Sequence, residues 1–287
     1  MAFNKKTFCS LVITFMCPAI SHADILGNPT LIGEPGKLEI QIGGGKDELT
    51  LDSTKSTGRL QIGATSEYKS LPASTGTFKE DQVFIKIAYP LNTRTQLFAD
   101  LGTGKDSGQK SSHQGIGVKF SPDDISEIKM GLILRVQQVK IDIDGPFALY
   151  SPYNQVSDGT TITSTGWGTP LNGSEQIKYT RFDAFFGASR NTGIIRPYGG
   201  LCLTRSSGTD TIAIDDMTTT LSYPVAGGVV TNSTRRVSFN ARSDISSKKY
   251  FSGVLGLSIN PQGSLGMTAE FQRGVQDSFM LSGNVRF

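Results

Sequence analysis

The sequence is poor in cysteine, in histidine and in long apolar runs. Of its 287 residues, 3 are cysteine and 2 are histidine, which leaves few ligands for a transition-metal site. Beyond residue 23 no apolar run can span a membrane as a helix, because such a helix needs about 20 consecutive apolar residues. We therefore expect no metal site, no cofactor and no helical membrane anchor in that part of the chain.

Residues 1–23 have the organisation of a secretory signal peptide. Lys5 and Lys6 precede an apolar run that ends near Ile20, and a small residue, Ala23, closes the segment. A basic start, a short apolar centre and a small-residue cleavage site are typical of export signals. We expect export through the Sec pathway and cleavage after Ala23.

Removal of this segment would change the charge and the chemistry that remain. Without Lys5 and Lys6 the chain keeps 26 basic and 25 acidic residues, so its charge gives no argument for a nucleic-acid partner. Cys202 and His113 would be the remaining cysteine and histidine, which excludes an intramolecular disulfide. We expect residues 24–57 to form a periplasmic segment or a first hairpin, and residues 58–287 to form the main domain.

Most of the chain alternates apolar and polar residues with a period of two, which is typical of strands and not of helices. The segments with this pattern are 58–68, 82–91, 94–103, 113–120, 127–140, 176–189, 194–206, 248–259, 264–272 and 277–287. These ten segments predict an all-β protein. A weaker segment, 37–43, would raise the number to twelve if it formed a further hairpin with part of 44–56.

The expected connections between these segments alternate in length. Short turns are expected at 92–93, 121–126, 189–193 and 260–263, and longer loops at 104–112, 141–175 and 206–248. Short turns at one end and long loops at the other are typical of outer-membrane barrels, whereas loops this long are uncommon in compact soluble domains. The pattern predicts a transmembrane antiparallel up-and-down β-barrel of about ten strands, with short periplasmic turns and long extracellular loops. The alternative is a secreted β-sandwich.

The last strand ends in an aromatic residue. Phe279, Leu281, Val285 and Phe287 share one face of it and alternate with polar residues. Together with the export signal and the strand RPYGGLCL, this ending resembles that of bacterial outer-membrane β-barrels, of the small OmpA type or porin-like. The resemblance implies a place in the outer-membrane lipid and recognition of the last strand by the barrel-assembly machinery.

If the apolar faces contact lipid, the opposite faces line the lumen. The charged residues on those faces are Lys86, Asp100, Lys119, Lys129, Arg135, Arg181, Asp183, Arg196, Glu270 and Arg286. Such charges belong inside, because Arg or Lys facing lipid at the midplane costs roughly 2–4 kcal/mol. They allow two interpretations: a paired network that closes a narrow ten-stranded barrel, or a small diffusion pore with a mild anion preference, because basic residues predominate.

His113 is the one side chain that could serve a hydrolase as its base. Ser111 shares its face of the strand, and Asp100 on the neighbouring strand could orient the ring. Its place at the junction of a loop and a strand indicates a residue of the barrel rim instead. We expect a non-enzymatic structural or surface-binding role, with an extracellular ligand bound through 141–175 and 206–248. The pore is the alternative, and a hydrolase using His113 the third hypothesis.

Overall fold

The structure is a computed structural model. It describes residues 26–62, 64–71, 73–106, 109–122, 127–147, 150–157, 160–168, 171–224, 230–247, 250–261 and 263–287. Their strands belong to one antiparallel sheet. Among these residues no helix is long and apolar enough to cross a membrane. The expected signal peptide lies outside them.

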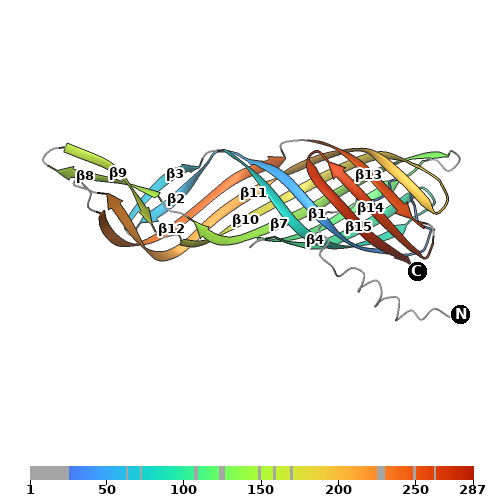
Figure 1. Ribbon diagram of the computed structural model, residues 1–287, viewed down its shortest axis with the longest axis horizontal. Coiled ribbons are helices and arrows are strands. Elements are labelled where there is room, and N and C mark those ends of the chain that lie inside the picture. Colours follow the sequence, from blue (N-terminus) through green and yellow to red (C-terminus); the bar gives the residue numbers. More distant parts are fainter. Residues whose placement is uncertain are drawn as a thin grey trace.

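Within the described residues, ten strands close into a barrel (Figure 1). In ring order they are β1 (Glu39–Ser53), β4 (Ser74–Pro90), β5 (Thr95–Asp106), β6 (Gln109–Phe120), β7 (Ile128–Phe147), β10 (Leu171–Arg190), β11 (Ile195–Pro224), β13 (Phe251–Ile259), β14 (Leu265–Arg273) and β15 (Gln276–Arg286). The ring closes where β15 pairs with β1, from Glu39 opposite Arg286 to Leu49 opposite Gln276. The predicted ten-stranded barrel is confirmed, and the β-sandwich alternative is wrong because one sheet closes on itself.

The first strand of the ring lies earlier in the chain than the sequence pattern indicated. β1 pairs with β4 along one edge and with β15 along the other. The predicted first strand, 58–68, lies instead in a hairpin of β2 (Ser56–Ile62) and β3 (Thr65–Leu71), which joins the sheet through β12 (Val230–Ser247). The twelve-stranded alternative is also wrong, because residues 39–53 form one continuous strand and no hairpin.

Inward glycines explain why β1 was hard to predict. Gly43 is paired with Phe84 on β4, and a Cβ at Gly43 would lie 2.6 Å from Cζ of that ring. Gly256 on β13 is paired with Tyr198 in the same way, and its missing side chain leaves the space that the tyrosine ring fills. Glycine opposite an aromatic residue is a stable cross-strand arrangement, but it interrupts the apolar alternation in the sequence.

Replacing Gly256 by alanine is expected to lower the free energy of unfolding by about 1–3 kcal/mol, because the new methyl group would displace the packed Tyr198 ring. Urea unfolding of the refolded protein in detergent micelles measures the change. Gly253→Ala on the same strand is the matched control, since no atom lies within 4 Å of the Cβ position there. Equal losses in the two variants would contradict the packing argument.

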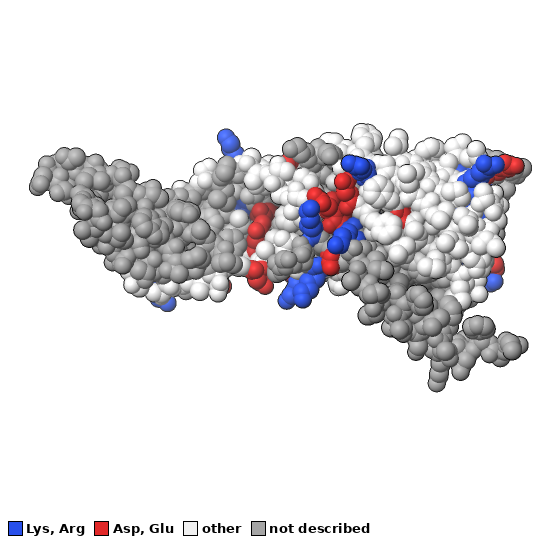
Figure 2. All heavy atoms as spheres, viewed as in Figure 1, with Lys and Arg blue, Asp and Glu red and all other residues white. Residues whose placement is uncertain are grey.

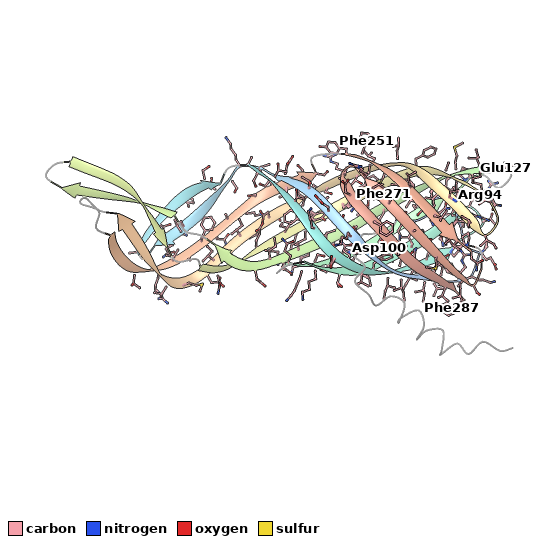
Figure 3. All side chains as sticks on the ribbon, in the orientation of Figure 1. Arg94, Asp100, Glu127, Phe251, Phe271 and Phe287 are labelled. Carbon is pink, nitrogen blue, oxygen red and sulfur yellow. The ribbon has the colours of Figure 1, made fainter. Side chains whose placement is uncertain are left out.

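The two ends of the barrel differ in their connections. The connections after β4, β6, β10 and β13 are short and lie at one end, where Figure 3 shows Arg94 and Glu127. At the other end the chain continues into an extension beyond the ring (Figure 1). It contains the β2–β3 hairpin, the hairpin of β8 (Tyr150–Ser157) and β9 (Thr160–Gly168), and β12 (Val230–Ser247), which pairs with the far part of β11.

The regions expected to be long loops are therefore mostly strand. β7, β8, β9 and β10 account for the described residues of 141–175, and β11 and β12 for those of 206–248. The expected loop at 104–112 is short, because β5 ends at Asp106 and β6 begins at Gln109. The expectation failed because these stretches carry polar residues on both faces, which hides the period of two. Their threonines nevertheless favour strand structure.

Candidate functional site

The ring places its apolar side chains on the outside. Phe251 and Phe287 are 67% and 69% exposed, and Figure 3 shows both, with Phe271, projecting from the outer surface. Three residues of the expected assembly signal, Phe279, Leu281 and Val285, lie on the outer face of β15, and the exposed Phe287 follows directly after it. Figure 2 shows one face of the molecule, on which charged side chains gather in a belt beside a largely uncharged stretch of the ring.

The charged residues expected in the lumen lie inside the ring. Lys86, Asp100, Arg135, Arg181, Asp183, Arg196 and Glu270 are at most 5% exposed, and Lys119, Lys129 and Arg286 are partly buried. The walls of a water-filled pore would remain accessible to water. The interior at these residues is instead filled by packed side chains.

The centre of this packing is an ion cluster around Asp183 on β10. Arg135 donates to Asp183 Oδ2 through Nε at 3.0 Å and through Nη2 at 2.6 Å. Arg181 Nε donates to Oδ1 at 2.9 Å, and the Thr204 hydroxyl donates to the same oxygen at 2.6 Å. Both oxygens of the buried carboxylate are satisfied, so the cluster joins the adjacent strands β7, β10 and β11 on the inner face of the ring as one hydrogen-bonded unit.

A second polar group lies on the neighbouring strands. Gln137 Nε2 donates to Asp100 Oδ1 at 3.2 Å. Lys86 on β4 is the cross-strand neighbour of Asp100 on β5. Its ammonium lies 4.8 Å from the centre of the Phe98 ring, which is a cation–π contact. These interactions hold the side chains of Lys86 and Asp100 against the inner face of the sheet, where they occupy part of the interior.

The segment before β1 lies inside the short-turn end of the barrel. The amide N–H groups of Leu26 and Gly27 donate to the two carboxylate oxygens of Glu270, at 2.9 and 2.8 Å. The Tyr198 hydroxyl donates to Glu270 Oε2 at 2.7 Å. Leu26 is 1% exposed and belongs to an apolar cluster with residues of the ring. Residues 26–33, which are buried or partly buried, are called the amino-terminal plug below.

The amino-terminal plug has further contacts with the wall. The hydroxyl groups of Thr30 and Ser189 share a hydrogen bond, and Lys119 Nζ donates to the Leu31 carbonyl at 3.2 Å. The sequence placed residues 24–57 in a periplasmic segment or a hairpin, and it contains no pattern that indicates a place inside the ring. One weak signal for such a segment was Glu270. The strand pattern places its carboxylate inside the ring but assigns it no hydrogen-bond partner.

Towards the extension the interior becomes apolar. A cluster of buried side chains lines it: Leu49, Leu51, Val139, Ile141, Ile177, Tyr179, Ile245 and Val275. The period-two pattern predicted a polar inner face, and these strands depart from it where they rise beyond the outer apolar band. Above that band the inside of a barrel needs a hydrophobic core like that of any water-exposed domain.

His113 is buried in the interior and is not the rim residue that its place in the sequence indicated. It is 5% exposed, and its ring covers Gly102 on β5. Neither His113 Nε2 nor Ser111 Oγ has a hydrogen-bond partner among the described residues, so these two atoms do not bond each other. A cavity of about 880 Å³, bordered by six ring strands, lies at the level of His113 and Tyr179. Among the described residues no group of three or more His, Cys, Asp or Glu is placed to hold a metal ion.

A carboxyl pair lies in the extension, seven residues beyond the outward Phe182 along β10. Glu175 and Asp210 share a hydrogen bond. Their cross-strand neighbours are Ile143, Ile177, Ile212 and Ser243. Burial raises the pKa of Glu175 to about 7, and the nearby Asp210 carboxylate contributes to the rise. Burial also raises the pKa of Asp210. The folded extension therefore favours the protonated pair.

The stability of the extension is expected to decrease with rising pH. A raised carboxyl pKa means that the folded state binds more protons than the unfolded state between pH 4.5 and about 7, so the added stability is lost across this window. Urea unfolding followed by the fluorescence of Trp167, the single tryptophan, reports on β9 in the extension. Glu175→Gln should flatten the pH dependence and Asp244→Asn, at an exposed carboxylate on β12, should not. A wild-type midpoint that stays constant across the window would refute the expectation.

Comparisons with known proteins find distant structural likeness only. No protein-family model and no curated protein matches the chain. Among solved structures it is similar to the outer membrane protease OmpT from Escherichia coli, with 12% identity, coverage of 90% of this chain and 99% of that one, and a TM-score of 0.42. It is also similar to Neisserial surface protein A (14% identity, 74% and 97% covered, TM-score 0.26) and to the translocator domain of the autotransporter NalP from Neisseria meningitidis (12%, 98% and 96%, 0.33). At these values the likeness carries no argument about function, and the site itself must supply one.

Proposed function

We propose that the protein is an outer-membrane β-barrel with a closed lumen, which holds a strand-rich extension at the cell surface for binding. The outer face supports the membrane location. Large apolar side chains cover the ring strands, among them Ile116 and Leu201 at 69% and 65% exposure. Soluble proteins rarely expose apolar patches larger than a few hundred Å². In lipid such a face is favourable, and closure of the sheet pairs the backbone groups that lipid cannot solvate.

The observation that carries the proposal is the burial of the lumen charges. Arg135 and Arg181 both donate to the buried Asp183 on the inner face of the ring, and the amino-terminal plug is bonded to Glu270 at its short-turn end. Ions cannot pass through groups that exclude water. This favours a scaffold over the diffusion pore, for which the same charges would have to line an aqueous path.

The arrangement of the connections supports a role at the surface. With the short turns and Phe287 in the periplasm, the extension projects outward from the membrane. Besides the β2–β3 hairpin, the extension contains strands from 141–175 and 206–248, the two regions through which we propose that an extracellular ligand binds. The proposed role is non-enzymatic. The expected signal peptide, Sec export and recognition of β15 by the assembly machinery belong to the same proposal.

Planar-bilayer recording tests the closed lumen. The protein is refolded and shown to form a barrel by the shift of its unheated gel band, then added to bilayers. We expect no reproducible conductance step, for the wild type and equally for His113→Ala. Regular steps with an anion-selective reversal potential would overturn the closed lumen in favour of the pore.

A surface-binding role requires a second test. Cells that produce the protein are compared with cells that produce a variant lacking the β8–β9 hairpin, residues 150–168, on arrays of immobilised glycans and matrix proteins. We expect binding to one or more array members that the hairpin deletion abolishes, while the heat-dependent band shift of the barrel persists. Equal adhesion of the two strains across the array would count against binding through this hairpin.

A further inference from the structure

Four outward lysines lie together beyond the apolar band on four neighbouring strands of the ring. They are Lys105 on β5, Lys110 on β6, Lys140 on β7 and Lys178 on β10. Three are exposed, and the side chain of Lys140 is 43% exposed. This group is called the lysine patch.

Register places the lysines opposite one another in pairs. Lys105 is the cross-strand partner of Lys110, and Lys140 is the cross-strand partner of Lys178. Directly opposed side chains have Cβ atoms about 4.5–5.5 Å apart, and like charges at this position destabilise a sheet. Two such pairs side by side are unfavourable unless an anion lies between them.

Carboxylates of the chain compensate only part of this charge. Asp142 Oδ2 accepts from Lys140 Nζ at 2.6 Å, and its other oxygen accepts from Gln176 Nε2 at 2.7 Å. Asp81 is the cross-strand partner of Lys105. Asp142 is also the cross-strand partner of Lys110. The same two rows of the described sheet contain the exposed Lys46, Arg242 and Asp244 further along, so three carboxylates face six basic residues. By contrast Lys79, on the outer face of β4, has its own partner in Glu48 at 2.9 Å.

Along the barrel axis, the lysine patch lies as far beyond the outer apolar band as lipid headgroups lie beyond the hydrocarbon chains. Lys105 lies four residues beyond the exposed Leu101, Lys140 four beyond Val136, and Lys178 four beyond Phe182. Neutral polar side chains occupy the outward positions between the apolar residues and the lysines: Thr103, Ser112, Gln114, Gln138 and Thr180. The outer surface thus changes from apolar to neutral polar to basic along the barrel axis, as the lipid changes from chains to linkage to headgroup.

We propose that the lysine patch binds the phosphate of a phosphorylated lipid headgroup in the outer leaflet. A phosphate would lie between the opposed lysines, accept hydrogen bonds from their ammonium groups and relieve their repulsion. The neutral side chains below would contact the polar linkage of the same lipid. The inference rests on the proposed membrane location and adds a specific lipid partner to it.

Electron paramagnetic resonance of spin-labelled lipids tests the site. The full chain is reconstituted in phosphatidylcholine vesicles with a trace of spin-labelled phosphatidic acid or spin-labelled phosphatidylcholine, and the association of each label with the protein is compared. At low salt we expect phosphatidic acid to be preferred by about fivefold, the factor that one lysine near a membrane surface supplies. Lys140→Gln with Lys178→Gln should bring the preference close to one, and the corresponding pair of arginine substitutions should retain it.

The control removes the same charge elsewhere. Lys37→Gln with Lys79→Gln takes away two lysines that each pair with a carboxylate, at 2.5 and 2.9 Å, and should keep the preference. A preference near one in the wild type, with labelled phosphatidylcholine still motionally restricted by the protein, overturns the headgroup site and leaves the membrane barrel standing. Equal losses in the patch and control variants also overturn it. Absence of any restricted lipid would refute the membrane location, and the headgroup site with it.

Discussion

Replacing Asp183 by alanine is expected to lower the free energy of unfolding by roughly 3–5 kcal/mol, the typical result of removing one partner from a buried ion pair. Asp183 is completely buried and accepts hydrogen bonds from Arg135, Arg181 and Thr204. Its loss would leave two guanidinium groups inside the barrel without their carboxylate. Because whole domains are stable by only about 5–15 kcal/mol, much of the variant should fail to reach the folded, heat-sensitive gel band.

The measurement is the folded fraction by gel shift, followed by urea unfolding of whatever folds. Asp215→Ala, at an exposed carboxylate on β11, is the control and should have little effect. A further variant separates charge from volume: Asp183→Leu combined with Arg135→Met and Arg181→Met replaces the three charged members of the cluster by apolar groups. It should recover most of the lost stability, because such replacements of complete clusters are often neutral. If Asp183→Ala unfolds no more easily than the wild type, the cluster does not hold the ring together.

The outer surface of the barrel could be predicted from the sequence because one physical requirement repeats along every strand. Residues such as Val83, Ile85 and Ile87 alternate with Gln82, Phe84 and Lys86, and the structure exposes the first set and buries the second. A period of two assigns a face without any knowledge of which strands are neighbours. The inward position of Arg135, Asp183 and Glu270 follows from the same rule.

Partners inside the ring could not be predicted, because they depend on contacts between distant residues. Arg135 and Asp183 are 48 residues apart, and Leu26 is 244 residues from Glu270. The sequence therefore did not show whether the charged residues of the lumen form ion pairs or line a water-filled path. β1 was missed for a different reason: Gly43 carries no side chain, and its role is to accommodate Phe84 on the next strand. The alternation of apolar and polar residues shows which face of a strand a side chain occupies. It gives no signal for a glycine whose role is to leave space for a side chain on the next strand.

Two separate structures occupy the interior, and this bears on how the amino-terminal plug is held. The ion cluster around Asp183 consists of ring residues, whereas the plug is a separate segment bonded to the wall. Glu270 provides the acceptor for two backbone amides of the plug and for the Tyr198 hydroxyl. One side chain thus joins the plug, β11 and β14, so its removal should release the segment without unfolding the ring.

Glu270→Ala is expected to expose the amino-terminal plug. Asn28→Cys provides a reporter, because Asn28 is 3% exposed and Cys202, the native cysteine beyond the expected signal peptide, is buried. Labelling of the introduced thiol by a water-soluble maleimide should accelerate about 100-fold in the Glu270→Ala background. That factor corresponds to the roughly 3 kcal/mol expected for losing one or two hydrogen bonds to a charged group. Tyr198→Phe removes one of the three contacts and leaves both amide bonds, so it should accelerate labelling far less. If Glu270→Ala leaves the rate unchanged, the packing of Leu26 and the contacts of Thr30 hold the plug instead.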